Sequence, residues 1–81
     1  MDRFHQQYQE MGPRHRLTVD DAEHLMWELA GEDNTIWTNR KKGYRLAARR
    51  WHPDVKGGDE TVFKLLQRVY GVLVQYNPEW R

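Results

Sequence analysis

The stretch YRLAARRWHPDVKGGDETVFKLLQRVYGVL, residues 44–73, decides the fold. It contains two runs with helical periodicity, one on each side of a short polar loop. In both runs apolar residues recur at intervals of three and four, which places them on one face of an α-helix. The first face consists of Tyr44, Ala47, Ala48 and Trp51, and the second of Val62, Phe63, Leu66, Val69 or Tyr70, and Leu73. The pattern predicts two amphipathic helices.

The loop between these helices begins with His52-Pro53-Asp54. Proline fixes its own φ and pushes the preceding residue out of the α region, so the first helix should end near Trp51. His52 and Asp54 should then point outward from a stiffened turn. Because no nucleophile lies nearby in the sequence, a catalytic pair is not indicated. The arrangement indicates a contact point for another protein.

A further helix is predicted ahead of this pair. Thr18, followed three residues later by Asp21, resembles a capping box, and Gly31 is a natural helix end. The buried face of this helix would be formed by Ala22, Leu25, Met26 and Leu29. Three helices and no strand pattern predict an all-α protein.

Helix boundaries follow from caps and breakers. The second helix should run from about Thr38 to Trp51, with Thr35, Thr38 or Asn39 as its cap. Gly43 is a weak point inside it. Asp59 should cap the third helix, and Asn77-Pro78 should end it.

One core and three segments are expected. The core should contain Leu25, Met26, Leu29, Tyr44, Ala48, Trp51, Phe63, Leu66, Tyr70 and Leu73. Residues 17–76 would form the domain, and residues 77–81 a C-terminal tail. Residues 1–16 would be a polar tail or a short docking helix, since Phe4, Tyr8 and Met11 have helical spacing.

Composition restricts the function. A chain of 81 residues buries only about 60% of its unfolded surface, which leaves little room for a catalytic cavity. The sequence has no cysteine and no serine, and His5, His15, His24 and His52 do not have metal-ligand spacing. We therefore expect no enzyme activity, no cofactor, no metal and no small-molecule substrate. With no membrane-length apolar run and no signal-peptide pattern, a cytoplasmic protein is expected, or a nuclear one if it is eukaryotic or viral, neither secreted nor membrane-bound. A monomer is expected as well.

The net charge of +1 conceals two charged blocks. Residues 20–33 contain six acids and no Lys or Arg, whereas residues 40–51 contain six bases and no acid. The bases are Arg40, Lys41, Lys42, Arg45, Arg49 and Arg50. A basic block indicates an acidic partner, although a simply solvated helix face produces the same pattern.

Taken together, the basic run ending in Trp51, the His-Pro-Asp triplet, the Lys56-Gly-Gly-Asp-Glu60 loop and the apolar run that follows resemble the J domain of DnaJ-type (heat-shock forty) co-chaperones. The resemblance covers roughly residues 19–76. It implies an antiparallel hairpin of the second and third helices, with a shorter first helix packed along it and the triplet in the connecting loop.

The resemblance also implies a function. J domains bind a DnaK-type (heat-shock seventy) chaperone and stimulate its ATP hydrolysis without performing chemistry themselves. Carried over by position, the triplet is the trigger and Lys41 and Arg45 are the main docking bases. The remaining partner-binding candidates on the basic helix are Lys42, Arg49 and Arg50.

Two positions depart from the family pattern. Leu46 stands where many members have a base, and Arg40 stands where an apolar residue is common.

Two other functions remain open. A basic helix with Tyr44 and Trp51 interleaved is compatible with nucleic-acid binding, although these aromatics fall on the buried face and the pI of about 8.1 is low for such a domain. A purely structural interaction module would also explain the periodicity.

Overall fold

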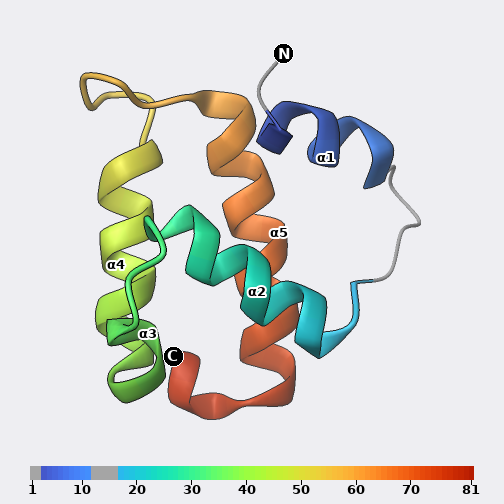
Figure 1. Cartoon of the computed structure of the whole chain (residues 1–81), viewed down its shortest axis with the longest axis vertical. Coiled ribbons are helices and arrows are strands. Elements are labelled where there is room, and N and C mark those ends of the chain that lie inside the picture. The colour runs from blue at the N-terminus through green and yellow to red at the C-terminus, as the bar shows by residue number, and fades with distance from the viewer. Residues whose placement is uncertain (1–2, 12–16) are drawn as a thin grey trace.

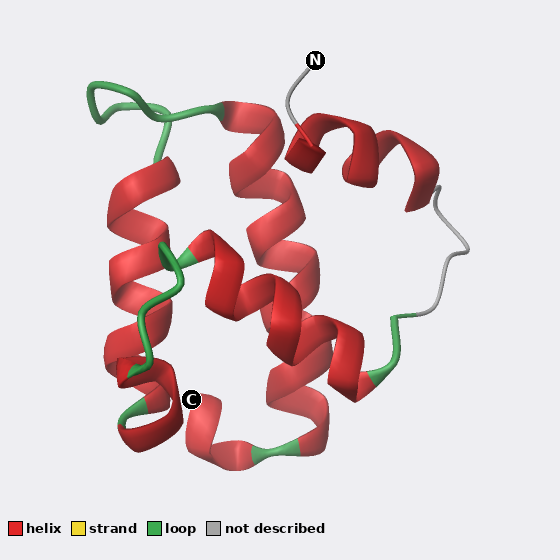
Figure 2. Cartoon of the chain, viewed as in Figure 1, coloured by secondary structure: helices red, strands yellow, loops and turns green. Residues whose placement is uncertain are grey.

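The structure is a computed structural model of the 81-residue chain in which residues 3–11 and 17–81 are described. Within these two ranges all regular structure is helical, so the all-α prediction is confirmed there (Figure 1; Figure 2). The elements are α1 (Arg3–Met11), α2 (Val19–Leu29), α3 (Thr35–Thr38), α4 (Arg40–Trp51), α5 (Glu60–Tyr76) and the 3-10 turn η1 (Pro78–Trp80).

Two antiparallel helices, α4 and α5, form the frame of the molecule (Figure 1). Helix α2 lies across both of them, and α1 packs beside α5. The short α3 packs on α4, and η1 returns the chain to contact both α4 and α5. The loop at residues 52–59 therefore stands at one end of the frame, and η1 at the other.

Three side-chain caps determine where the main helices begin. Thr18, Asn39 and Asp59 each accept a hydrogen bond from the backbone N–H three residues later, at 3.1 Å in each case. Such a cap satisfies one of the N–H groups that the first helical turn leaves free. The predicted caps at Thr18 and Asp59 are thus confirmed, and Asn39 is the cap chosen among the three candidates for the second helix.

Helix α4 begins two residues later than expected. Thr38 belongs to the separate turn α3, and Asn39 breaks the path with an extended backbone (φ −146°) before α4 starts at Arg40. The Asn39 side chain explains this start, because it can cap α4 only from a non-helical conformation. The helix ends at Trp51, as the following His-Pro pair predicts.

The core lies where α2, α4 and α5 meet. Of the ten expected core residues, those of α2 and two of α5 are buried, namely Leu25, Met26, Leu29, Leu66 and Leu73. The others are only half-buried at its rim, namely Tyr44, Ala48, Trp51, Phe63 and Tyr70. Four of these five are aromatic side chains that pack against the core from α4 and α5, and the fifth is the small Ala48. Ala47 takes the buried position on α4 instead.

The first and last helical segments of the described residues join this core. Residues 3–11 form a helix whose Met11 is buried, while residues 1–2 and 12–16 of the proposed N-terminal segment, with His15, lie outside the described residues. Residues 77–81 are not a free tail, because η1 places Trp80 in the core with 1% of its surface exposed. Trp80 follows Asn77-Pro78 and belongs to no periodic run, so periodicity gives no sign of its burial.

Gly43 is a site of close helix approach rather than a mere weak point. It is buried, and a Cβ there would lie 2.8 Å from the Ile36 Cα and closer still to the Ile36 side chain. Real Cβ atoms essentially never come so near a backbone atom. The absence of a side chain thus allows α3 to pack against α4.

Substitution of Gly43 by alanine is expected to destabilise the fold by about 1–3 kcal/mol, the usual cost of overpacking. In an unconstrained helix the same change would stabilise by about 1 kcal/mol. Chemical denaturation measures the sign directly. Gly71→Ala in α5 is the matched control, because a Cβ there meets no atom within 4 Å. Stabilisation by both changes would contradict the close contact between α3 and α4.

Candidate partner-binding surface

The loop after α4 is held by a series of backbone hydrogen bonds. The His52 N–H donates to the Ala48 carbonyl at 2.9 Å, which completes α4, and ψ of 131° then turns the chain out of the helix. Val55 N–H donates to the His52 carbonyl at 3.0 Å, and Asp59 N–H donates to the Trp51 carbonyl at 3.0 Å. The last bond closes the loop at its base, so the triplet stands on a defined turn.

The His52 ring lies against α5. The His52 and Phe63 rings meet edge to face, with centroids 5.2 Å apart and planes at 67°. The Asp54 N–H donates to Nδ1 of His52 at 3.2 Å, so in the neutral ring the proton resides on Nε2. Phe63 and the turn therefore orient a ring that remains 45% exposed.

Asp54 presents its carboxylate to solvent. Its side chain is 91% exposed, and the nearest basic group is Nδ1 of His52 at 3.8 Å. Pro53 and Val55 beside it are exposed as well. An exposed carboxylate on a short turn is free to accept charge-assisted hydrogen bonds from a cation on another molecule.

The two glycines of the loop, Gly57 and Gly58, are required for different structural reasons. Gly57 adopts a φ of +86°, a region that side chains other than glycine rarely occupy. At Gly58 a Cβ would lie 2.9 Å from the Val55 carbonyl oxygen and would also clash with the His52 backbone. Both glycines are thus needed for the tight return of the chain to α5.

Asp59 closes the loop and caps α5. Its Oδ1 accepts the Val62 N–H, and this bond holds the pKa of the carboxyl below its ordinary value. Partial burial acts in the opposite direction, and the His5 side chain, whose Nε2 lies 2.6 Å from Oδ2, adds to the lowering of the pKa. The charged form of Asp59 is therefore the form that suits the folded loop.

The basic helix α4 exposes most of its cations. Arg40 pairs with Glu79 at 2.5 Å, and within residues 3–11 and 17–81 no other base of α4 forms an ion pair within 4 Å, although Lys42 interacts electrostatically with Asp33. The exposed bases are Lys41, Lys42, Arg45, Arg49 and Arg50. The charges of Lys41, Arg45, Arg49 and Arg50 form no ion pair within the described residues, which produces a positive potential next to the loop.

These bases do not form one patch. Lys41 and Arg45 are one helical turn apart, and the same stripe continues seven residues on to His52. Arg50 lies about 140° around the helix from Arg45. Its guanidinium lies over the Trp51 ring and beside Gly31, on the side of α2. The structure thus brings Lys41 and Arg45 into line with the loop and separates Arg50 from them.

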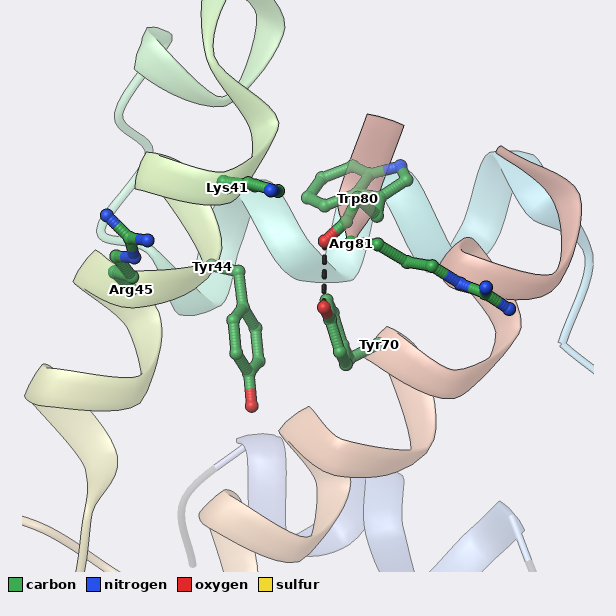
Figure 3. A pocket seen from close by; sticks show the side chains of 6 residues that line it. All are labelled: Lys41, Tyr44, Arg45, Tyr70, Trp80 and Arg81. Carbon is green, nitrogen blue, oxygen red and sulfur yellow. Dashed lines mark hydrogen bonds between the residues drawn. The ribbon is translucent and has the colours of Figure 1, made fainter. Parts of the chain in front are cut away.

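A pocket of about 230 Å³ opens beside this stripe (Figure 3). Stacked rings of Tyr44 and Tyr70 line it, with centroids 3.9 Å apart. The Tyr70 hydroxyl donates to the Trp80 carbonyl at 2.7 Å, which joins the pocket to η1. Its remaining lining residues are Lys41, Arg45 and Arg81. An aromatic floor with cations around it suits an acidic segment of a partner.

Of the two positions that differ from the common J-domain sequence, Arg40 has a local explanation, whereas nothing in the structure explains Leu46. Arg40 is the first residue of α4, and its guanidinium lies 6.0 Å from the Trp80 ring centre while it pairs with Glu79. The Trp80 ring thus supplies apolar contact at this position. Leu46 is half-buried and does not belong to the core cluster. Leu46 thus interrupts the basic residues of α4 with an uncharged side chain that is not part of the core cluster.

Other kinds of site find less support in the described part of the chain. Tyr44 is stacked on Tyr70, and the Trp51 indole donates to the Leu29 carbonyl at 2.8 Å, so both rings are engaged within the protein rather than free to stack on bases. No cluster of three His, Cys, Asp or Glu side chains able to hold a metal occurs in the two described ranges. None of the described helices is long and apolar enough to cross a membrane.

Sequence reasoning missed several residues of this surface. The sequence predicts Phe63 as a core residue, yet it also supports the His52 ring. Gln67, which donates to the Tyr44 hydroxyl at 2.8 Å, and Tyr70 with Trp80 were not assigned to it at all. The contacts of Gln67 and Tyr70 depend on how α4 and α5 are aligned along each other, and the spacing of residues within one helix does not give this alignment.

No protein-family model, curated protein or solved structure matches this chain.

Proposed function

We propose that this chain is a J-domain co-chaperone that binds a DnaK-type (heat-shock seventy) chaperone and stimulates its ATP hydrolysis. The observation that carries the proposal is the exposed His52-Pro53-Asp54 turn, in line with uncompensated cations on α4. Further support comes from the antiparallel α4 and α5, the loop between them and the crossing helix α2. The family resemblance implies such a hairpin with the triplet in its connecting loop, but it places the first helix along the hairpin, whereas α2 lies across it.

The proposed mechanism is a shift of the partner's conformational equilibrium. The chain would bind one state of the chaperone, the state that hydrolyses ATP, more tightly than the other, and so increase its population. Lys41 and Arg45 would attract an acidic surface of the chaperone, and Asp54 would accept hydrogen bonds from a cation on it. His52 would present its ring beside that bond.

The charges of α4 provide a test of the docking surface. Arg45→Gln is expected to weaken chaperone binding by about threefold to tenfold, mainly through a slower association rate, because an exposed charge at an interface acts chiefly on encounter. Arg50→Gln removes the same charge from the α2 side of the same helix and should leave affinity within about twofold. Surface-based binding kinetics measures both rates.

The salt dependence of the association rate provides a second test of the docking surface. Charges more than about 10 Å apart are screened at 0.1 M salt, so wild-type association should slow as salt rises and approach the rate of Arg45→Gln. Equal losses in the two variants would show that α4 acts only through its total charge. Saturable binding of duplex or single-stranded nucleic acid that Arg45→Gln abolishes, without any chaperone effect, would favour the nucleic-acid alternative instead.

A further inference from the structure

Helix α1, which lies outside the segment that resembles a J domain, contacts the base of the loop. Two consecutive residues of α1 touch the two residues that close it. Phe4 packs against Trp51, and His5 binds Asp59. Trp51 and Asp59 are joined by the backbone hydrogen bond of 3.0 Å between the Asp59 N–H and the Trp51 carbonyl. Helix α1 therefore contacts both ends of the loop at the point where they converge.

The contact on the α4 side is aromatic. The Phe4 and Trp51 rings meet edge to face, with centroids 5.5 Å apart and planes at 80°. This geometry is the favourable one for two aromatic rings. The Trp51 indole N–H donates to the Leu29 carbonyl, so the ring is fixed from α2 as well. Trp51 is the last residue of α4, and its position sets where His52 leaves the helix.

The contact on the α5 side is polar. Nε2 of His5 lies 2.6 Å from Oδ2 of Asp59, while the other carboxylate oxygen accepts the Val62 N–H. The two side chains are about one-third exposed, at 31% and 32%. A single carboxylate thus caps α5 with one oxygen and is held by α1 with the other.

The attachment of α1 does not depend on these two residues alone. Met11, at the far end of the helix, is buried in the core, and Tyr8 packs against the core cluster. Arg3 pairs with Glu28 of α2. The contacts of Phe4 and His5 can accordingly be removed while the rest of the helix stays in place.

The geometry points to Phe4 and His5 as positioning residues for the His-Pro-Asp loop, which they hold closed through Trp51 and Asp59. This restricts the loop to the turn in which the His52 ring lies on Phe63 and Asp54 faces solvent. The effect of this positioning on chaperone stimulation rests on the proposed function, whereas the effect on the conformation of the loop is independent of it.

Hydrogen exchange of the full-length protein tests the positioning without any partner. In Phe4→Ala and His5→Ala the amides of Val55, Gly58 and Asp59 are expected to exchange about tenfold faster, as the loss of one good contact would allow. Amides in the centre of α5, such as those of Leu66 and Val69, should stay within about twofold of wild type. If Phe4 and His5 only stabilised the fold as a whole, hydrogen exchange would become faster in the loop and in the centre of α5 alike.

Two variants sharpen this test. His5→Gln can still donate a hydrogen bond to Asp59 and should restore slow exchange in the loop. Gln9→Ala, on the exposed side of α1, should change nothing. Unchanged loop exchange in both Phe4→Ala and His5→Ala would overturn the assignment, and so would equal acceleration in the loop and in α5.

Stimulation of chaperone ATP hydrolysis by the same variants separates the two proposals. If the wild-type protein stimulates, His5→Ala should require more protein for half-maximal stimulation, and unaltered stimulation despite faster loop exchange would overturn the functional half of the inference. If the wild-type protein does not stimulate, the proposed function fails, and hydrogen exchange still decides whether α1 positions the loop.

Discussion

His52→Gln is expected to abolish the stimulation of chaperone ATP hydrolysis while the protein stays folded. The side chain lies in a loop, is 45% exposed, meets the Phe63 ring edge to face and accepts the Asp54 N–H. Loss of these contacts should cost about 1 kcal/mol or less, so the melting temperature should hardly change. Steady-state ATPase and a thermal melt of the same sample measure both quantities.

Val55→Ala is the matched control for this substitution. Val55 belongs to the same loop, is 41% exposed and should retain full stimulation. If stimulation survives in His52→Gln, the triplet is not the trigger. If His52→Gln unfolds the protein, the role of His52 is structural, and its contact with Phe63 carries more of the fold than its exposure indicates.

Trp80→Ala is expected to destabilise the fold by about 3–5 kcal/mol, the usual cost of truncating a buried tryptophan. The ring is 1% exposed between α4 and α5, with the Arg40 guanidinium over it. In a domain of this size such a loss lowers the melting temperature by about 12–40 °C. Urea denaturation gives the free energy of unfolding directly.

Trp37→Ala makes the same chemical change at an exposed site. The Trp37 side chain on α3 is 42% exposed, and its loss should cost about 1 kcal/mol or less. If the two tryptophan variants unfold at the same urea concentration, residues 77–81 are not part of the folded domain. The pocket lined by Trp80 and Arg81 would then be lost from the docking surface as well.

Local signals in the sequence predicted the main helices well. Thr18 and Asp59 begin helices where their capping side chains predict, and Trp51 ends one where the following proline requires it. The buried faces of α2 and α5 follow from spacing alone, because periodicity reports which side of a helix is apolar. The exposed position of the His52-Pro53-Asp54 turn follows from the same local rules.

Features that depend on distant contacts could not be predicted in this way. The need for Gly43 arises from the approach of Ile36, and the burial of Trp80 arises from the space that α4 and α5 leave between them. Likewise, the division of the α4 bases into a loop side and an α2 side requires the position of α2. The charge count alone treats Arg45 and Arg50 as equivalent, whereas the fold separates them.

The stimulation of chaperone ATP hydrolysis by the wild-type chain tests the central proposal most directly. A DnaK-type chaperone saturated with ATP should hydrolyse it faster as the protein is added, and the rate should reach a plateau, as expected for binding at one site. An unchanged rate at concentrations where the protein is shown to be folded would contradict the proposed function.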